Sequence, residues 1–341
     1  MGIHNLHKFL RKICPHVYEQ ILISKYRYDK IAIDISLYIC KYKSTYGVNW
    51  LNAFLNLIVC LRKNEINCVF IYDTGCVPEK NEERRSRAIQ RDRLKSRIVM
   101  LEEAITNYNV NGIINPCLID LYNKKKKNQQ LLTPTDTTID IIFIDYIVNK
   151  MKSHLFTISG NDFRLTKELC TILKIPFFNS PLEAETMCAD LCKRKLVNAV
   201  LSEDSDVLAY GSPILLLKLN MLNGKCLQIK YSNLLKSLYL TSSQFLDFCI
   251  MCGTDYNKNI YRVGPDKAYN LIKTYSTIEN ISKYIDTSIL NHIRIREIFT
   301  NYEQRHINIP SCQSPNINLL TDFIVKHNIN IDISYLKSCL L

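Results

Sequence analysis

The sequence predicts an α/β fold in which a central, mainly parallel sheet is flanked by helices. Two apolar runs, residues 30–35 and 67–72, have the near-continuous hydrophobicity of strands that are buried on both faces. Helical periodicity fills residues 36–46 and 52–63 between them, and a strand–helix–helix–strand order implies a parallel pair. Each run ends at an aspartate, Asp34 and Asp73. Because functional groups gather at the carboxyl ends of parallel strands, we expect these two carboxylates to lie close together.

A second acidic segment lies at residues 180–206. Glu183 and Glu185 precede a helical pattern over residues 186–195, and a short apolar strand at 198–201 is followed by Asp204 and Asp206. A helix followed by a strand can bring both pairs to one edge of a sheet. Four such carboxylates would repel one another and raise each other's pKa. A divalent cation relieves that repulsion, and oxygen ligands suit Mg²⁺ or Mn²⁺, so the pattern predicts a metal site.

Structural alternatives remain for both acidic pairs. Ser180-x-x-Glu183, with Pro181 at the first helical position, also fits a capping box, which would make Glu183 purely structural. The stretch from Glu203 to Asp206 alone could be a solvated turn. The aspartates at the two earlier strand ends favour the metal site.

Composition indicates a polyanionic partner. The 341 residues include 44 Lys and Arg against 32 Asp and Glu, a net charge of +12. Basic side chains around a carboxylate cluster suit a phosphate-rich substrate held beside a metal. The 14 cysteines are scattered, and Cys249-x-x-Cys252 lacks a second pair at zinc spacing. With no recognisable signal peptide, free thiols in a reducing compartment are expected. The longest apolar run, residues 54–61, is too short to span a bilayer.

Other segments complete the predicted order of elements. We expect a helix over residues 3–22 and a basic helix over 79–103. Residues 104–135, which include Lys124–Lys127, should be irregular, and 76–135 as a whole should be a basic insertion without its own core. A helix at 139–151, a strand at 154–159 and a helix at 166–173 should follow. A hairpin is predicted from residues 214–219 and 226–231 around Asn223-Gly224.

A further carboxylate and a helix start follow the hairpin. Asp255 lies in Gly253-Thr254-Asp255-Tyr256, just after an apolar helix at residues 242–251. Gly264-Pro265 opens the next helix, whose free backbone N–H groups suit a phosphate. Residues 276–341 read as short helices and loops without evident chemistry.

These ordered motifs resemble the flap endonuclease (5′-nuclease) family of structure-specific DNA nucleases over roughly residues 1–300, with a divergence and composition like those of the poxviral members. The resemblance rests on the N-terminal Met1–Leu6, on Ile33-Asp34 and Tyr72-Asp73, on Glu183-Ala184-Glu185, on Asp204-Ser205-Asp206 and on Gly253–Tyr256. It implies a PIN-like nuclease core at 1–235 with an arch at 76–135, a helix–turn–helix clamp on duplex DNA at 236–300, and a helical tail at 301–341.

The resemblance also implies a site with two Mg²⁺ ions, for which Mn²⁺ can substitute, clamping the attacking and leaving oxygens of a phosphodiester. Glu185, Glu183, Asp34 and Asp73 would lie on the side of the nucleophilic water. Asp204, Asp206 and Asp255 would hold the second ion.

DNA contacts are implied at a separate set of positions. Lys80 and Arg87 match, by their offset from Asp73, two phosphate-contacting basic residues, and Arg84 and Arg85 are near enough to substitute. The complete implied set is Gly2, Lys80, Arg84, Arg85, Arg87, Gly264 and Lys267. At the clamp of the family a monovalent ion such as K⁺ often bridges backbone carbonyls to phosphate.

Several positions depart from the family pattern. Arg262 replaces the first Gly of the clamp and Asp266 a basic residue, which leaves K⁺ an open alternative. Cys40 stands where a base-stacking Tyr is found, and the C-terminus lacks the short sliding-clamp motif. These departures bear on substrate preference more than on chemistry.

The leading hypothesis is a Mg²⁺-dependent endonuclease and 5′-exonuclease that cleaves 5′-flapped or branched DNA in viral replication, repair or recombination. If the poxviral resemblance holds, it would act in the host cytoplasm. One alternative is a catalytically inactive scaffold that binds branched DNA and recruits other proteins. A less favoured alternative is an RNase on the same fold.

Overall fold

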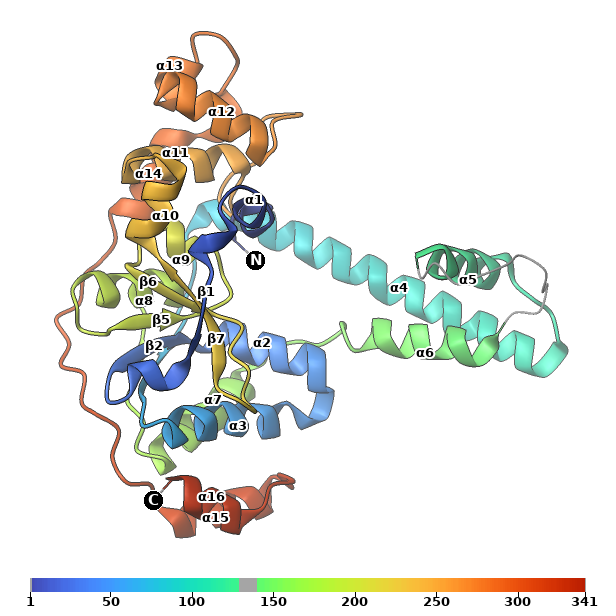
Figure 1. Ribbon diagram of the computed structural model, residues 1–341. Helices are drawn as coiled ribbons and strands as arrows, with labels where there is room; N and C mark the ends of the chain where they lie inside the picture. Colours follow the sequence, from blue (N-terminus) through green and yellow to red (C-terminus); the bar gives the residue numbers. More distant parts are fainter. Residues whose placement is uncertain (1, 129–139, 341) are drawn as a thin grey trace.

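A sheet domain and one long helical projection make up the molecule (Figure 1). The computed structural model describes residues 2–128 and 140–340. Seven strands form a single sheet in the order β1-β7-β6-β5-β2-β3-β4. The strands are β1 (Glu19–Leu22), β2 (Lys30–Asp34), β3 (Asn67–Tyr72), β4 (Phe177–Asn179), β5 (Ala199–Leu201), β6 (Ile214–Leu217) and β7 (Lys225–Lys230).

The five strands from β6 to β4 run parallel, which confirms the predicted fold class. Only β7 is antiparallel to its neighbours, β6 and β1, so the predicted hairpin is also confirmed. In the middle of the sheet, Ile33 of β2 lies between Leu201 of β5 and Phe70 of β3.

Alternation of side chains along each strand divides the core into two layers. Val69 and Ile71 of β3 join the layer on one face, while Phe70 and Tyr72 join the layer on the other. The first face is covered by α1 (Leu6–Ile13), α8 (Ala184–Lys193), α9 (Asp206–Ala209), α10 (Tyr231–Leu238) and α11 (Ser242–Cys252). The second is covered by α2 (Ile35–Tyr46), α3 (Trp50–Lys63), α7 (Gly160–Ile172), α15 (Ile317–Lys326) and α16 (Ile333–Leu340).

Further helices extend the first layer at the end of the molecule drawn uppermost in Figure 1. They are α12 (Pro265–Tyr275), α13 (Ile278–Ile281) and α14 (His292–Thr300). Phe248 of α11, Ala268 and Ile272 of α12 and Phe299 of α14 are buried in the same core as the sheet face. This helical end therefore packs continuously onto the sheet domain.

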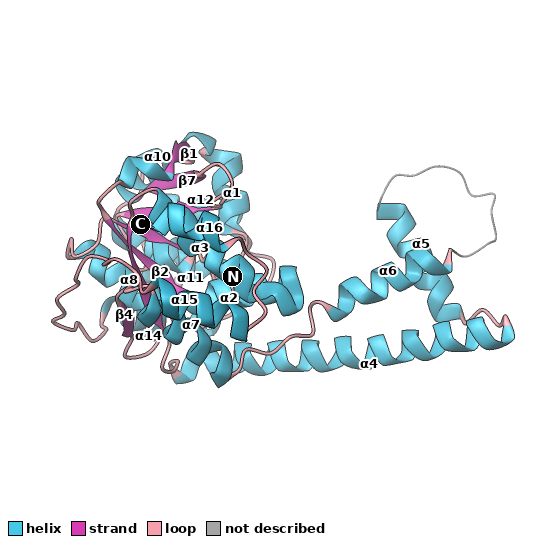
Figure 2. Ribbon diagram, turned by 90° about the horizontal axis from the view of Figure 1, so that it is seen from below, coloured by secondary structure: helices cyan, strands magenta, loops and turns pink. Residues whose placement is uncertain are grey.

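The projection consists of α4 (Asn81–Asn111), α5 (Pro116–Asn128) and α6 (Ile141–Lys152), and it reaches far from the sheet (Figure 2). The prediction of an irregular, coreless insertion is wrong for its described part. A small core joins the three helices through Ile98, Leu101, Ala104, Leu118, Leu121, Ile144, Ile147 and Val148. The apolar positions of α4 are widely spaced among charged residues, so they do not give a recognisable helical pattern in the sequence. The side chains of Lys124–Lys127 and the segment 129–135 lie outside the described residues.

Two smaller expectations are also wrong. The N-terminal helix ends at Ile13, because Pro15 lacks the N–H that would continue it and instead begins the 3₁₀ turn Pro15–Val17. Residues 154–159 form a connection rather than a strand. Its last residue, Ser159, forms a capping box with Asp162 and so starts α7 earlier than predicted.

The sheet topology places acidic residues along one edge. β5, β2, β3 and β4 are consecutive and parallel, and one or more of the predicted site carboxylates lies at the last residue of each strand or a few residues beyond it. The last carboxylate, that of Asp255, comes from outside the sheet, and Gly253 precedes it. Its φ of +91° turns the chain sharply after α11, a conformation that an L side chain rarely adopts.

None of the helices within residues 2–128 and 140–340 is both long enough and apolar enough to cross a membrane.

Replacing Leu101 with Ala should loosen the projection without unfolding the sheet domain. Leu101 is 1% exposed, and truncation of a buried Leu costs about 2–5 kcal/mol. A small separate core can open independently of the rest of the protein. Hydrogen exchange should therefore quicken in α4–α6 and remain slow in β2 and β3. Val99→Ala, on the same helix at a position that is 46% exposed, is the matched control and should exchange like the wild type. An equal loss of protection in the sheet would contradict a separate core.

Candidate active site

Seven carboxylates gather at the carboxyl edge of the parallel strands. They belong to Asp34, Asp73, Glu183, Glu185, Asp204, Asp206 and Asp255. Six are buried, with residue exposures between 0% and 7%, and Asp73 is half-buried. The predicted acidic residues are therefore brought to one region by four neighbouring strands and the turn after α11.

Asp34 and Asp73 are each tied to the start of a helix. Asp34 is the N-cap of α2 and accepts a hydrogen bond from the Leu37 backbone N–H at 3.3 Å. Asp73 Oδ1 accepts from the backbone N–H of Ala184, the first residue of α8, at 2.6 Å. A carboxylate at the positive end of a helix is electrostatically favoured. Asp73 thus connects the end of β3 to the helix that carries Glu185.

Glu183 does not form the capping box considered from sequence. It is the N-cap of α8, but its side chain makes no capping hydrogen bond. Ser180 Oγ instead donates to the Glu183 carbonyl at 2.7 Å. The Glu183 carboxylate is left to accept from the Tyr256 hydroxyl and the Lys80 ammonium. The capping-box interpretation of Glu183 is therefore wrong.

Asp204 and Asp206 are buried rather than solvated. The Asp206 backbone N–H donates to Asp204 Oδ1 at 3.0 Å, while both carboxylate oxygens of Asp206 lack a hydrogen-bond partner among the described residues. Gly2, with φ +76°, packs against this pair, because a Cβ there would lie 2.2 Å from Asp204 Oδ1. A buried carboxylate without donors is costly, which points to a missing positive partner.

Burial and mutual repulsion raise the pKa values of four of these acids. Burial is the largest cause at Asp34, Glu185, Asp204 and Asp206. The charge of Asp73 adds to the rise at Asp34, and the charges of Asp204 and Asp255 add to it at Asp206. The site therefore binds protons more readily than exposed carboxylates do and favours any cation that replaces them.

Two basic side chains from the base of α4 enter this acidic set. Lys80 is 15% exposed, and its Nζ lies 2.6 Å from Glu183 Oε1, 3.6 Å from Glu185 Oε1 and 3.5 Å from Asp255 Oδ2. Arg87 contacts both carboxylate oxygens of Asp255 at 2.8 Å. Burial alone would lower the pKa of Lys80, but the charges of Glu185 and Glu183 outweigh it and raise the pKa. Lys80 therefore remains an ammonium.

Lys80 also affects how the carboxylates are arranged. Among the described residues, no three His, Cys, Asp or Glu side chains converge closely enough to hold an ion as they stand. The ammonium of Lys80 lies between three of the carboxylates and neutralises part of their charge. A metal ion would have to draw these side chains away from Lys80.

The remaining predicted DNA-binding residues lie apart from the carboxylates. Arg84 is exposed and donates to Cys76 Sγ at 3.0 Å, and Arg85 is exposed on the same helix. Neither forms an ion pair with the acidic set within the described part of the chain. Gly264 and Lys267 lie at the start of α12, on the helical end of the molecule.

No role was predicted from the sequence for Tyr256 or Tyr210. Tyr256 donates to Glu183 and shares a hydrogen bond of 2.8 Å with the Tyr210 hydroxyl. Burial raises the pKa of both phenols, so both hydroxyls keep their protons. Tyr256 follows Asp255 directly and could have been noticed there, but no sequence pattern pairs it with Tyr210. Together they orient Glu183.

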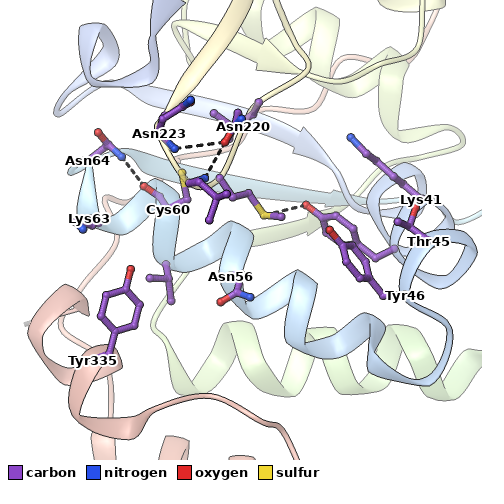
Figure 3. A pocket seen from close by; sticks show the side chains of 16 residues that line it. Lys41, Thr45, Tyr46, Asn56, Cys60, Lys63, Asn64, Asn220, Asn223 and Tyr335 are labelled. Carbon is purple, nitrogen blue, oxygen red and sulfur yellow. Dashed lines mark hydrogen bonds between the residues drawn. The ribbon is translucent and has the colours of Figure 1, made fainter.

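A hollow separate from the acidic edge lies between α2, α3, the β6–β7 hairpin and α16 (Figure 3). Its volume is about 780 Å³, and its lining contains Lys41, Lys63 and several Asn residues but no Asp or Glu. Lys41 is engaged by Glu203, outside the lining. Because its lining has no carboxylates, this hollow lacks the oxygen ligands that a divalent ion prefers. The acidic edge is therefore the candidate active site.

The donor set at the acidic edge fits Mg²⁺ or Mn²⁺. All seven candidate ligands are carboxylates, which these hard ions prefer. The unpartnered oxygens of Asp206 and its raised pKa indicate that Lys80 and Arg87 leave part of the negative charge of the site unbalanced. The described carboxylate donors thus match a hard divalent cation.

Comparison with known proteins agrees with this geometry. The sequence model of the XPG N-terminal domain matches residues 1–94, and that of the XPG I-region matches residues 174–255. Together they span slightly more than half of the chain and contain all seven carboxylates, Lys80 and Arg87. The chain belongs to the XPG/flap endonuclease family. It is therefore a nuclease, a hydrolase of phosphodiester bonds.

Individual relatives match over nearly the whole chain. A probable RAD2-like endonuclease of Invertebrate iridescent virus 6 is 36% identical, covering 99% of this chain and 91% of the relative. Flap endonuclease 1 of Plasmodium chabaudi chabaudi is 28% identical over 97% of this chain and 69% of its own length. The viral relative comes from an iridescent virus rather than a poxvirus.

A solved structure supports the fold. The catalytic core of Rad2 in complex with DNA substrate superposes with a TM-score of 0.69, at 15% identity, covering 99% of both chains. At this identity the match concerns the architecture only.

Asp206→Asn should stabilise the protein in the absence of divalent metal. The folded-state pKa of Asp206 is raised, so ionisation opposes folding as pH rises through that pKa, and the cost disappears when the carboxyl is protonated at low pH. We expect a gain of about 1–3 kcal/mol near pH 8 that shrinks toward about pH 5. Thermal unfolding in EDTA measures it.

Asp92→Asn, on the exposed face of α4, is the matched control and should change stability little at any pH. A destabilised Asp206→Asn protein at alkaline pH would contradict the account of Asp206 as an uncompensated buried charge.

Proposed function

We propose that this nuclease is Mg²⁺-dependent and cleaves branched or 5′-flapped DNA. It would cut both at internal phosphodiester bonds of a DNA strand and from the 5′ end of a strand. The observation that carries the proposal is the carboxylate edge, with Lys80 and Arg87 entering it from the base of a basic helix. Metal-binding acids and phosphate-binding cations in one site suit a phosphodiester substrate.

The seven carboxylates would divide their roles as the family resemblance implies. Asp34, Asp73, Glu183 and Glu185 would hold the ion beside the attacking water, and Asp204, Asp206 and Asp255 the other. When bound, Mg²⁺ supplies Lewis-acid polarisation of the phosphodiester and lowers the pKa of a water molecule. Tyr256 and Tyr210 fix the direction of Glu183.

Lys80 and Arg87 would contact the reacting phosphate. They already lie beside the acids, and the metals would compete for the same carboxylate oxygens. A phosphate oxygen can replace the carboxylates as their partner, so both side chains would move a short way from acid to substrate. In that position they would stabilise charge on the phosphate.

The projection would guide the DNA strand toward this site. Arg84, Arg85, Arg91, Arg93, Lys95 and Arg97 are exposed along α4. The base of the helix is tied to the helical end of the molecule by Glu79 with Arg294 and by Glu82 with Lys258. We therefore assign an arch for single-stranded 5′ ends to α4–α6, the nuclease core to the sheet domain up to residue 235, and a duplex-DNA clamp to residues 236–300.

We also place this activity at viral replication sites in the host cytoplasm. The similarity to a viral endonuclease supports a viral setting. The described residues include all 14 cysteines, each a free thiol, and a reducing compartment suits them.

Cleavage of a panel of end-labelled DNAs tests the proposal. The panel contains a 5′ flap, a nick, a four-way junction and a single strand, each with Mg²⁺ or EDTA, together with a flap made of RNA. We expect Mg²⁺-dependent cutting near the branch. Asp204→Asn/Asp206→Asn should lower the rate by about three orders of magnitude or more while binding stays within a few-fold, because it removes ligands and not DNA contacts.

The double variant Asp92→Asn/Glu103→Gln, with the same charge change on α4, is the control and should cut normally. Tight junction binding by the wild type without any cutting would favour the scaffold alternative, and faster cutting of the RNA flap would favour the RNase. Undiminished cutting by the Asp204/Asp206 variant would contradict the site.

A further inference from the structure

Two cysteines from distant parts of the chain meet where the connection between α14 and α15 lies against β3. This connection, residues 301–316, contains no helix or strand and runs from the helical end to α15 at the opposite end of the molecule (Figure 1). Near its end, Cys312 Sγ lies 4.0 Å from Cys68 Sγ. Cys68 is the second residue of β3 and is fully buried. The two sulfur atoms are therefore in van der Waals contact.

Hydrogen bonds from three parts of the sheet domain set the position of Cys312. Its backbone N–H donates to Asn67 Oδ1, on β3, at 3.0 Å. The N–H of the next residue, Gln313, donates to the carbonyl of Lys174, just after α7, at 3.2 Å. The guanidinium of Arg62, on α3, donates to the Gln313 carbonyl at 3.2 Å. The contact between the two sulfurs is thus held by the surrounding backbone and does not depend on one side chain alone.

The surroundings of Cys312 favour its thiolate. A hydrogen bond from the Cys68 thiol and the charge of the Arg62 guanidinium outweigh burial and lower the pKa of Cys312 to about 7. The pKa of Cys68 is raised, because Cys68 donates that hydrogen bond and is buried. Burial also raises the pKa of Cys170, in the same core layer, to about 12. Cys312 is only half-buried, so it is the nucleophilic thiol of this group that a small oxidant can reach.

We propose that Cys312 and Cys68 are an oxidisable pair, which a hydroperoxide converts to a disulfide. The Cys312 sulfur attacks one oxygen of the peroxide bond and becomes a sulfenic acid. The other oxygen takes up the proton that Cys312 released and leaves as an alcohol or water. The Cys68 sulfur then attacks the Cys312 sulfur, and the hydroxyl group leaves as water with the Cys68 proton. Two electrons pass from the sulfurs to the peroxide.

The disulfide needs only a small movement of the connection. Bonded sulfurs are about 2.0 Å apart, so the two atoms must approach by about 2 Å. The segment that carries Cys312 has no secondary structure and can move while β3 stays in place. The bond ties the connection to the start of β3, at the opposite end of the strand from Asp73. In a reducing compartment such a bond is transient and returns to two thiols.

Peptide mapping of the full-length protein after brief treatment with hydrogen peroxide tests this. The remaining thiols are alkylated in denaturant, and the protein is digested with trypsin. The wild type should give residues 64–80 joined to residues 306–326, with a mass two hydrogens below the sum of the two peptides. Cys76→Ser, which removes the other cysteine of the first peptide, should give the same link. Cys188 and Cys192, which are buried on α8, are the internal control and should stay alkylated.

Two variants separate the roles of the two thiols. Cys68→Ser keeps a hydrogen-bond donor beside Cys312 but no second thiol, so Cys312 should remain a sulfenic acid that dimedone traps on residues 306–326. Cys312→Ser should leave Cys68 reduced.

Circular dichroism of the reduced variants checks that each is folded. Unlinked peptides from the wild type at a peroxide concentration that oxidises the half-buried Cys40 and Cys76 would overturn the inference. Oxidation of the α8 cysteines to the same extent as the pair would also overturn it. These readouts do not depend on DNA cleavage, so the inference stands or falls separately from the proposed function.

Discussion

The repulsion among buried carboxylates is the constraint on which the rest of this structure depends. Parallel strands deliver acids to one edge because their carboxyl ends coincide, and the helices that cover both faces bury them there. Ionised acids at such a depth destabilise the fold unless positive charge reaches them. The local structure meets that need at the other acids but not at Asp206, whose carboxylate oxygens have no hydrogen-bond partner among the described residues. Asp34 and Asp73 accept hydrogen bonds from backbone N–H groups at helix starts, and Glu183 accepts one from a tyrosine hydroxyl. The ammonium of Lys80 lies among three carboxylates.

The same constraint explains the position of α4. Its first turns must bring Lys80 and Arg87 to the acids, while the rest of the helix carries exposed basic residues away from the sheet. Metal and DNA together would replace what these two side chains now provide. Lys80 and Arg87 would therefore compete with metal ions from solution for the same carboxylates. Because the base of α4 is also tied to the helical end through Glu79 and Arg294, one helix connects the acids to the proposed duplex clamp.

The sequence predicted those features that local pattern and topology control. Asp34 and Asp73 could be placed together because continuous apolar runs identify buried parallel strands, whose ends must meet. The core of α4–α6 escaped notice because it depends on a few apolar positions among many charges. The contact between Lys80 and Asp255 joins residues far apart in the chain and depends on the direction of α4.

Anomalous diffraction from crystals grown with saturating Mn²⁺ and a nicked DNA product tests the central claim most directly. The claim is that the seven carboxylates hold divalent ions and that Lys80 yields its place among them. It predicts two anomalous peaks bounded by these carboxylates, with the Lys80 ammonium displaced from Glu183 toward a DNA phosphate. Crystals in which Lys80 remains between Glu183, Glu185 and Asp255, and in which no peak appears among the acids, would contradict it.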